Sequence, residues 1–241
     1  MVVVAFLLLI VHYFLDPNFD PVTGILNEDE SRHAIKSLRI VSGSEILIGD
    51  GKGNRHHSLV KLVGKKELVV DVVSTEKFEL PTPKLTIGIA PTKNPSRFEW
   101  FLEKATELGV YRIIPIESKR TERPRFKHDR AERIIHAATK QSMRAYIPVL
   151  EKLTPISEIL TMSNTLKLVA HCDESDKERI DIRDFLLSNP SDEVLVLIGP
   201  EGDFTSQEID QAKENGFQPV LLGRNRLRTE TAGVFAAAAL F

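Results

Sequence analysis

The chain has 241 residues, of which 42% are hydrophobic and 27% charged, and a formal net charge of −2 at pH 7. This is the composition of a soluble globular protein, and the length allows one large domain or two small ones. The single cysteine, Cys172, excludes an intramolecular disulfide framework and a cysteine-based zinc cluster. It indicates a cytoplasmic protein, although a bacterial periplasm is compatible with the same cysteine count.

The chain begins with an apolar run over residues 2–11. This run has no positively charged segment before it and no small-residue cleavage pattern, so we do not expect a signal peptide. It is also too short to span a bilayer, which takes about 20 residues. We interpret it as a buried strand or as an extension ahead of the true start, in preference to a membrane anchor.

Residues 20–73 have the pattern of a small β-rich domain. Apolar or alternating runs at 46–48, 59–63 and 68–73 predict strands, and the glycine-rich residues 49–54 predict a turn between the first two. These features together predict a small barrel.

One helix is predicted beside the barrel strands, over residues 28–40, with Asn27 as its cap. Ala34, Ile35 and Leu38 have the spacing to share one face of this helix.

A proline-containing segment, ELPTP at 79–83, is the best candidate for a linker, because proline breaks both helices and central strands. We therefore expect a barrel domain over 1–80, with 1–10 as a candidate extension, and a second domain over 81–241.

Strand-like and helix-like segments alternate in the second domain, which is typical of an α/β fold. We expect strands at 85–90, 111–116, 166–171, 194–198 and 219–222, and helices at 95–108, 129–143, 206–215 and from 229 onwards.

The first of these helices has clear boundaries, since Asn94 can cap it, Pro95 suits its first turn and Gly109 suits its end. We expect Trp100 to pack in the core rather than to stack on a base. The helical spacing also turns five other apolar side chains to the core: Phe98, Phe101, Leu102, Ala105 and Leu108.

Charge is distributed unevenly along the chain. Residues 112–144 hold ten Lys or Arg and four Asp or Glu, whereas residues 173–193 hold three and eight. A basic stretch on an acidic chain suits attraction to nucleic-acid phosphates, and a solvated helix face would produce the same pattern.

Two glycine-containing segments stand at strand ends: IGPEGDFT at 198–205 and LLGRNRLRTETA at 221–232. Loops between a strand and a helix are a usual place for a ligand in an open α/β sheet. Gly199, Gly202 and Gly223 allow the backbone to approach such a ligand closely. Neither G-x-G-x-x-G after a strand nor G-x-x-x-x-G-K-[ST] occurs, which argues against the common nucleotide-binding folds.

The two loops resemble those of the SPOUT class of methyltransferases, and within it those of the RsmE-like family of small-subunit (16S) ribosomal RNA uridine-N3 methyltransferases. The likeness covers nearly the whole chain, including HYF…DESRHAIKSLRI, KNPSRFEWFLEKATELGV and KQSMR, and is most specific in IGPEG and LRTETA. Three positions depart from the family pattern. Asp203 replaces a usual second glycine, Asn225 a frequent arginine and Arg226 an aliphatic residue.

The resemblance implies a C-terminal SPOUT domain with a mostly parallel sheet and a deep trefoil knot, preceded by a PUA-like β-barrel that binds RNA. It also implies a homodimer in which the partner subunit completes each active site. The expected substrate is 16S rRNA, within the small ribosomal subunit, and neither a metal nor a membrane is expected as partner.

The resemblance further implies S-adenosylmethionine as methyl donor, held largely by backbone groups of the two loops. Leu222 and Leu227 would form apolar walls for its adenine. The expected cofactor contacts are Leu197, Ile198, Gly199, Pro200, Gly202, Leu222, Gly223, Asn225, Leu227, Arg228 and Thr229.

The implied reaction is attack of uridine N3 on the sulfonium methyl group. N3 carries a proton at neutral pH, and that proton must leave. Glu201 and Glu230 are the candidate bases, and Arg228 is the candidate stabiliser of the resulting anion. Glu230 also suits the N-terminus of the last helix, with Thr229 as its cap.

Basic residues in both domains are the expected RNA contacts, and each would equally suit a solvated surface. His56-His57 and His171-Cys172 lack the spaced partners of a metal site. The expected RNA-binding residues are Arg32, Arg39, Lys93, Arg97, Arg120, Arg123, Arg125 and Arg144.

Two other functions fit the same loops. One is a different SPOUT enzyme, for example one that methylates the ribose 2′-oxygen of tRNA. The other is a non-catalytic RNA-binding factor of ribosome assembly. The intact GPEG and LRTETA sequences favour cofactor binding without establishing turnover.

Overall fold

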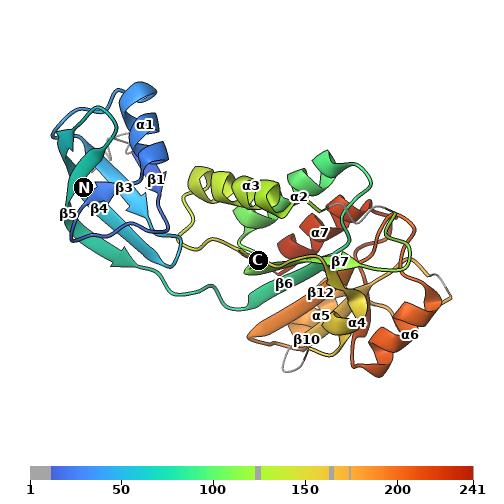
Figure 1. Ribbon diagram of the computed structural model, residues 1–241. Helices are drawn as coiled ribbons and strands as arrows, with labels where there is room; N and C mark the ends of the chain where they lie inside the picture. The colour runs from blue at the N-terminus through green and yellow to red at the C-terminus, as the bar shows by residue number, and fades with distance from the viewer. Residues whose placement is uncertain (1–11, 123–125, 163–165, 174, 241) are drawn as a thin grey trace. The chain divides into compact units, whose positions relative to one another are not determined.

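The computed structural model describes residues 12–122, 126–162, 166–173 and 175–240 (Figure 1). The chain divides into two compact units: residues up to Glu79 together with Thr139–Tyr146, and Leu80–Ala138 together with Ile147–Phe241. The apolar run at 2–11 and its interpretation lie outside the described residues, as do Arg123 and Arg125.

The first unit is built on a curled five-stranded sheet in the order β1-β3-β4-β5-β2. Strands β3, β4 and β5 are antiparallel neighbours, whereas β1 runs parallel to β3. The three predicted strands are confirmed, and β4 and β5 are longer than expected. The strands are β1 (His12–Leu15), β2 (Ile25–Leu26), β3 (Glu45–Gly49), β4 (Asn54–Val63) and β5 (Leu68–Lys77).

The predicted helix of this unit, α1 (Glu28–Lys36), begins as expected: the Asn27 side chain accepts a hydrogen bond from the amide of Glu30 at 2.9 Å. It ends before the expected residue 40, because Arg39 adopts a left-handed φ of 53°, which a right-handed helix cannot continue through. Ala34 is fully buried against the sheet, as predicted.

The second unit contains an eight-stranded sheet in the order β11-β13-β10-β12-β6-β7-β8, and every neighbouring pair in it is parallel. Strand β9 pairs with β7 off this path. The strands are β6 (Lys84–Ile89), β7 (Arg112–Glu117), β8 (Val149–Leu150), β9 (Thr154–Pro155), β10 (Leu166–Ala170), β11 (Ile180–Asp181), β12 (Glu193–Ile198) and β13 (Gln218–Leu221).

Helices cover both faces of this sheet (Figure 1). Strand β12 shows why: Val194, Val196 and Ile198 join one apolar cluster, with α2 and α7, while Leu195 and Leu197 join another, with α4 and α6. A central parallel strand is buried on both faces and is therefore apolar throughout. The helices are α2 (Pro95–Leu108), α3 (His128–Gln141), α4 (Ile156–Leu160), α5 (Ile182–Ser188), α6 (Ser206–Glu214) and α7 (Thr229–Ala238).

Helix α2 begins and ends where the sequence predicts. The Asn94 side chain accepts from the Ser96 amide at 3.1 Å, and Gly109 ends the helix at a φ of 96°. The expectation for Trp100 is wrong: this side chain is 43% exposed. Two residues of helix place it about 200° around the axis from the buried Phe98, on the outer face.

Sequence order and spatial order differ in this sheet. Strand β12 lies between β6 and β10, and after β13 the chain returns to pack α7 against α2, β6 and β12. The trefoil knot of this segment stays a prediction. Among the described residues, no helix is both long enough and apolar enough to cross a bilayer.

The contact between α7 and α2 generates the first prediction. A Cβ atom on Gly233 would lie 2.6 Å from the Phe101 ring and 2.9 Å from Ile89. A Gly→Ala change inside an exposed helix normally stabilises it by about 1 kcal/mol. Here we expect Gly233→Ala to lower the free energy of unfolding by about 1–3 kcal/mol, because the packed core has no room for the methyl group.

Urea unfolding measures this effect. Phe101→Leu, made in the Gly233→Ala background, should cost less than Phe101→Leu alone, because it removes the ring that the new methyl group meets. A Gly233→Ala protein more stable than the wild type would contradict the packing described above.

Candidate active site

A cavity of about 740 Å³ lies at the carboxyl ends of three neighbouring strands, β10, β12 and β13. The loops that follow these strands form its walls, and the first residues of α7 complete it. Both glycine-containing segments of the sequence meet here, as expected for the ligand site of an open parallel sheet.

A buried hydrogen bond joins the two glycine loops directly. The Thr229 hydroxyl donates to the Gly199 carbonyl at 3.1 Å. This differs from the expected role of Thr229, because the capping position of α7 is Arg228, whose side chain makes no capping bond. The expectation that Thr229 caps the helix is wrong, since its hydroxyl is used across the loops instead.

The loop after β12 accommodates the unusual Asp203. This residue has a left-handed φ of 63°, a conformation that glycine adopts freely and that Asp tolerates better than most residues. Its carboxylate accepts from the amide of Phe204 at 2.8 Å and from the amide of Cys172 at 2.7 Å. The aspartate therefore ties the loop after β12 to the loop after β10.

Nine of the eleven expected cofactor contacts line the cavity: Ile198, Gly199, Pro200, Leu222, Gly223, Asn225, Leu227, Arg228 and Thr229. Leu197 and Gly202 do not. Leu197 is fully buried on the opposite face of the sheet, because side chains alternate along a strand. The Gly202 carbonyl instead accepts from the Arg120 guanidinium at 2.7 Å.

The third wall of the cavity, the loop after β10, contributes His171, Cys172 and Arg179. Sequence reasoning missed all three, because this loop contains no glycine motif. The only available signal was its position after a predicted strand.

His171 is held in a charged network behind the cavity. Its side chain is fully buried, and its Nε2 lies 3.1 Å from Asp176 Oδ2, which also lies 2.7 Å from Lys213 Nζ. Burial lowers the pKa of His171 below its ordinary value of 6.5, and the opposing attraction of Asp176 and Asp203 does not reverse the shift. The imidazole is therefore neutral at neutral pH.

The three candidate catalytic residues occupy different positions. Glu201 and Arg228 are exposed and line the cavity, and one Glu201 oxygen accepts from the Lys93 amide at 2.9 Å. Glu230 is buried in the first turn of α7 and is not part of the lining. Its Oε1 lies 3.8 Å from Arg97 Nε, and its buried Oε2 has no hydrogen-bond partner among the described residues.

The expected RNA-binding residues do not form one surface. Arg32 pairs with Glu28 and Asp29 of its own helix, and Arg39 is exposed. Burial lowers the pKa of Arg144, whose carbonyl accepts from Tyr13.

Among the described residues, three of them lie in the second unit. Lys93 and Arg97 flank the start of α2 beside the catalytic candidates, while Arg120 donates to the carbonyls of Gly202 and Phe204. Lys93 also pairs with Glu122 at 2.8 Å. Part of the basic stretch therefore holds the loops of the cavity.

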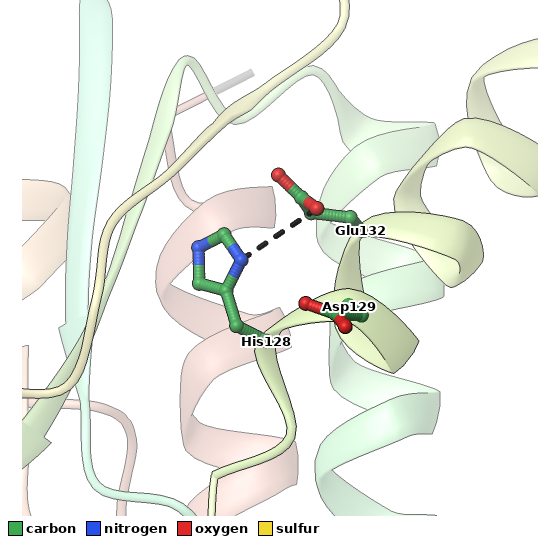
Figure 2. Close-up of side chains that lie close together, drawn as sticks. All are labelled: His128, Asp129 and Glu132. Carbon is green, nitrogen blue, oxygen red and sulfur yellow. Dashed lines mark ion pairs between the residues drawn. The ribbon is translucent and has the colours of Figure 1, made fainter.

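One group of side chains has the donor types of a metal site: His128, Asp129 and Glu132, at the start of α3 (Figure 2). The His128 Nδ1 lies 3.6 Å from a Glu132 oxygen. A helix N-terminus carries partial positive charge, which favours acidic side chains and disfavours a bound cation. We therefore interpret the group as first-turn helix stabilisation.

Comparison with known proteins assigns RNA methyltransferase domains to both parts of the chain. A family model described as an RNA methyltransferase domain matches residues 78–241, and one described as an RNA methyltransferase PUA domain matches residues 26–73. Ribosomal RNA small subunit methyltransferase E of Mesomycoplasma hyopneumoniae is 31% identical over 209 residues, which cover 83% of this chain and 86% of the relative.

Two solved structures are similar over 95% of this chain and 96% of theirs. A probable rRNA methyltransferase from Porphyromonas gingivalis is 36% identical, with a TM-score of 0.86. Ribosomal RNA small subunit methyltransferase E from Neisseria gonorrhoeae, bound to S-adenosyl methionine, is 29% identical, with a TM-score of 0.84.

The Asp203 tether generates a prediction. Asp203→Ala should lower the free energy of unfolding by about 1–3 kcal/mol, because alanine is strained at this φ and two hydrogen bonds to a carboxylate are lost. Asp203→Gly loses the same bonds without the strain and should cost less. In both variants the Cys172 amide should exchange its hydrogen faster. Equal stabilities for the two variants would show that the backbone conformation is not strained.

The buried His171 predicts a pH dependence of stability. Its pKa is lower in the folded than in the unfolded protein, so the unfolded protein binds the proton first as pH falls. Its contribution to stability is present above about pH 6.5 and is lost on acidification through the lowered folded pKa. His171→Asn should reduce the slope of unfolding free energy against pH in this window. Some slope should remain, because burial also lowers the pKa of His56. An unchanged slope would exclude His171 as a source.

Proposed function

The chain belongs to the RNA methyltransferase family that includes ribosomal RNA small subunit methyltransferase E, and from this premise we propose that it transfers a methyl group from S-adenosylmethionine to N3 of a uridine in 16S ribosomal RNA. The observation that carries the proposal is the cavity in which the two glycine loops are joined by the Thr229–Gly199 hydrogen bond, with Glu201 and Arg228 in its lining.

The lining has features that suit this cofactor. Leu222 and Leu227 offer apolar walls for an adenine ring, and Gly223, at a φ of 98°, has no heavy atom within 4 Å of the position where a Cβ would stand. The lining holds the carboxylates of Glu201 and Asp203, either of which would favour a sulfonium cation, together with four arginines: Arg179, Arg224, Arg226 and Arg228. When bound, S-adenosylmethionine supplies an electrophilic methyl group.

Residues of the chain would then remove the N3 proton and stabilise the charge that develops. Glu201 is the better placed base, because it lines the cavity and only one of its oxygens is used by the Lys93 amide. Arg228, exposed in the same cavity, would stabilise the negative charge that develops on the uracil ring. Glu230, in the first turn of α7, is paired with Arg97 and would hold that side chain at the start of α2.

RNA would be attracted by basic side chains at the cavity and by the barrel. Lys93 and Arg97 lie beside the catalytic candidates, and Arg32 and Arg39 are exposed on the first unit. Their contacts with phosphates would carry no sequence information, so recognition of one uridine needs further groups.

Three more properties belong to the proposal because they follow from the family resemblance. They are a cytoplasmic location, where ribosomal subunits are available; a knotted C-terminal chain; and a homodimer whose partner completes the active site. The half-buried Val234 and Phe235 on α7 suit helix packing between subunits. Sedimentation equilibrium tests the dimer.

The decisive experiment is methyl transfer from labelled S-adenosylmethionine to small ribosomal subunits, free rRNA and tRNA, followed by nucleoside analysis. We expect N3-methyluridine in small-subunit RNA. Ribose methylation would instead identify a different SPOUT activity, and cofactor binding without any product would identify an RNA-binding factor.

Variants of the cavity test the assigned roles. Arg228→Ala should lower kcat by about 100-fold or more, the usual cost of removing one stabilising donor, while the exposed position leaves folding intact. Arg224→Ala, an exposed arginine of the same loop, is the matched control and should retain most activity. Glu201→Gln should lower kcat by about 100-fold or more, as for loss of a general base, whereas Glu230→Gln should lower it less. Full activity of Arg228→Ala would remove it from the catalytic groups.

A further inference from the structure

A second cavity, of about 460 Å³, lies in the same unit and shares no lining residue with the first. It is formed by the segment after β6 and by the first turns of α2 and α3. Its volume falls within the range of about 300–1,000 Å³ usual for small-ligand sites. The lining residues that matter here are Thr92, Lys93, Ser96, Phe98, Phe126 and Lys127.

One wall of this second cavity is aromatic. Phe126 is half-buried and stands edge-on against Phe98, with ring centroids 5.8 Å apart and an interplanar angle of 83°. Phe98 is itself buried in the core, so it fixes the Phe126 ring from behind. A partly exposed ring that is supported in this way is a surface on which a nucleobase can stack.

The rim of the second cavity is charged. Three cations and one carboxylate line the cavity. Arg130 pairs with the carboxylate of Glu99, with NH2 and Oε2 2.8 Å apart, and that contact lowers the pKa of Glu99. Lys127 is exposed, and Lys93 is exposed and pairs with Glu122 at 2.8 Å. Cations around an aromatic wall suit a ligand that combines a flat ring with a phosphate.

Two hydroxyl groups of the lining add directional recognition. The Thr92 hydroxyl donates to the Asn94 carbonyl at 2.7 Å, and the Ser96 hydroxyl donates to the Asn94 side chain at 2.8 Å. Each hydroxyl has one hydrogen, which is already used, so each oxygen remains only as an acceptor. The pair would therefore accept hydrogen bonds from N–H groups on the edge of a base.

A hydrogen bond connects the second cavity to the first. Lys93 lines the second cavity, and its amide donates at 2.9 Å to Glu201, which lines the first. An RNA strand with one nucleotide at the first cavity would therefore have its neighbour beside the second.

From this placement we propose that the second cavity binds an unstacked nucleotide of the RNA next to the one that is methylated, with its base on Phe126 and its phosphate near Lys93 and Lys127. This inference rests on the proposed function, and it supplies the base-reading contact that phosphate-binding side chains cannot provide. Enzymes that modify one base commonly read the flanking nucleotides in this way.

Phe126→Leu tests the stacking surface, because leucine keeps an apolar side chain and removes the ring. With unmodified small-subunit ribosomal RNA made by transcription, we expect the dissociation constant and KM to rise about fivefold or more, as for loss of one base–aromatic stack. The kcat at saturating RNA and the calorimetric affinity for S-adenosylmethionine should stay unchanged. Tyr111→Leu, an aromatic side chain before β7 at the opposite end of the strands, is the matched control and should leave RNA affinity as it is.

Lys127→Ala provides a second variant whose exposed position does not endanger folding. It should weaken RNA binding and reduce the dependence of affinity on salt. Short RNAs with one abasic nucleotide beside the methylated position should bind the wild type more weakly than the intact RNAs do. Phe126→Leu should bind the abasic and the intact RNAs with equal affinity.

The outcomes separate the two proposals. If the wild type methylates RNA and Phe126→Leu binds RNA as tightly as the wild type, the nucleotide site is wrong and the proposed function stands. If the wild type methylates no RNA, the proposed function fails, and the RNA affinities alone decide on the site. If Tyr111→Leu weakens RNA binding to the same extent, the effect comes from a general loss of aromatic surface and the assignment of the nucleotide site is wrong.

Discussion

The buried hydrogen bond between the Thr229 hydroxyl and the Gly199 carbonyl is the contact on which the geometry of the site depends. It joins two loops that lie thirty residues apart in the sequence and follow different strands. Thr229 can reach Gly199 only because α7 returns from β13 to pack on α2, β6 and β12. The closeness of Gly233 to Phe101 permits that packing, so a core contact determines where Arg228 and Glu201 stand.

The loop after β10 completes the site through charges rather than through glycine. Asp203 ties this loop to the loop after β12, and Asp176, paired with Lys213, lies against His171. The left-handed backbone at Asp203 would strain most residues other than glycine. It is accompanied here by two side-chain hydrogen bonds that a glycine could not make. The departure from the family pattern at position 203 thus has a local structural role.

The basic residues of the second unit serve more than one purpose. Arg120 donates to two carbonyls of the loop after β12, and Arg97 pairs with the buried Glu230, whereas Lys93 and Lys127 line the second cavity. Clustered positive charge in the sequence therefore does not correspond to one continuous RNA-binding face. The division also separates residues that shape the first cavity from exposed residues that line the second.

The sequence alone determined the longer elements and the position of the two glycine-containing loops at strand ends. Caps such as Asn94 and Gly109, the apolar runs of β6 and β12, and the GPEG and LRTETA segments act over a few neighbouring residues, so they can be read locally. Short elements such as β8, β11 and α4 were missed, because their stability comes from their partners rather than from their own pattern. Only the tertiary structure decided that Leu197 faces away from the cavity, that His171 and Arg179 line it, and that Thr229 bonds to Gly199 instead of capping α7. These outcomes depend on which strand lies beside which, and the order β10-β12-β6 joins segments whose separation in the sequence carries no signal of their contact.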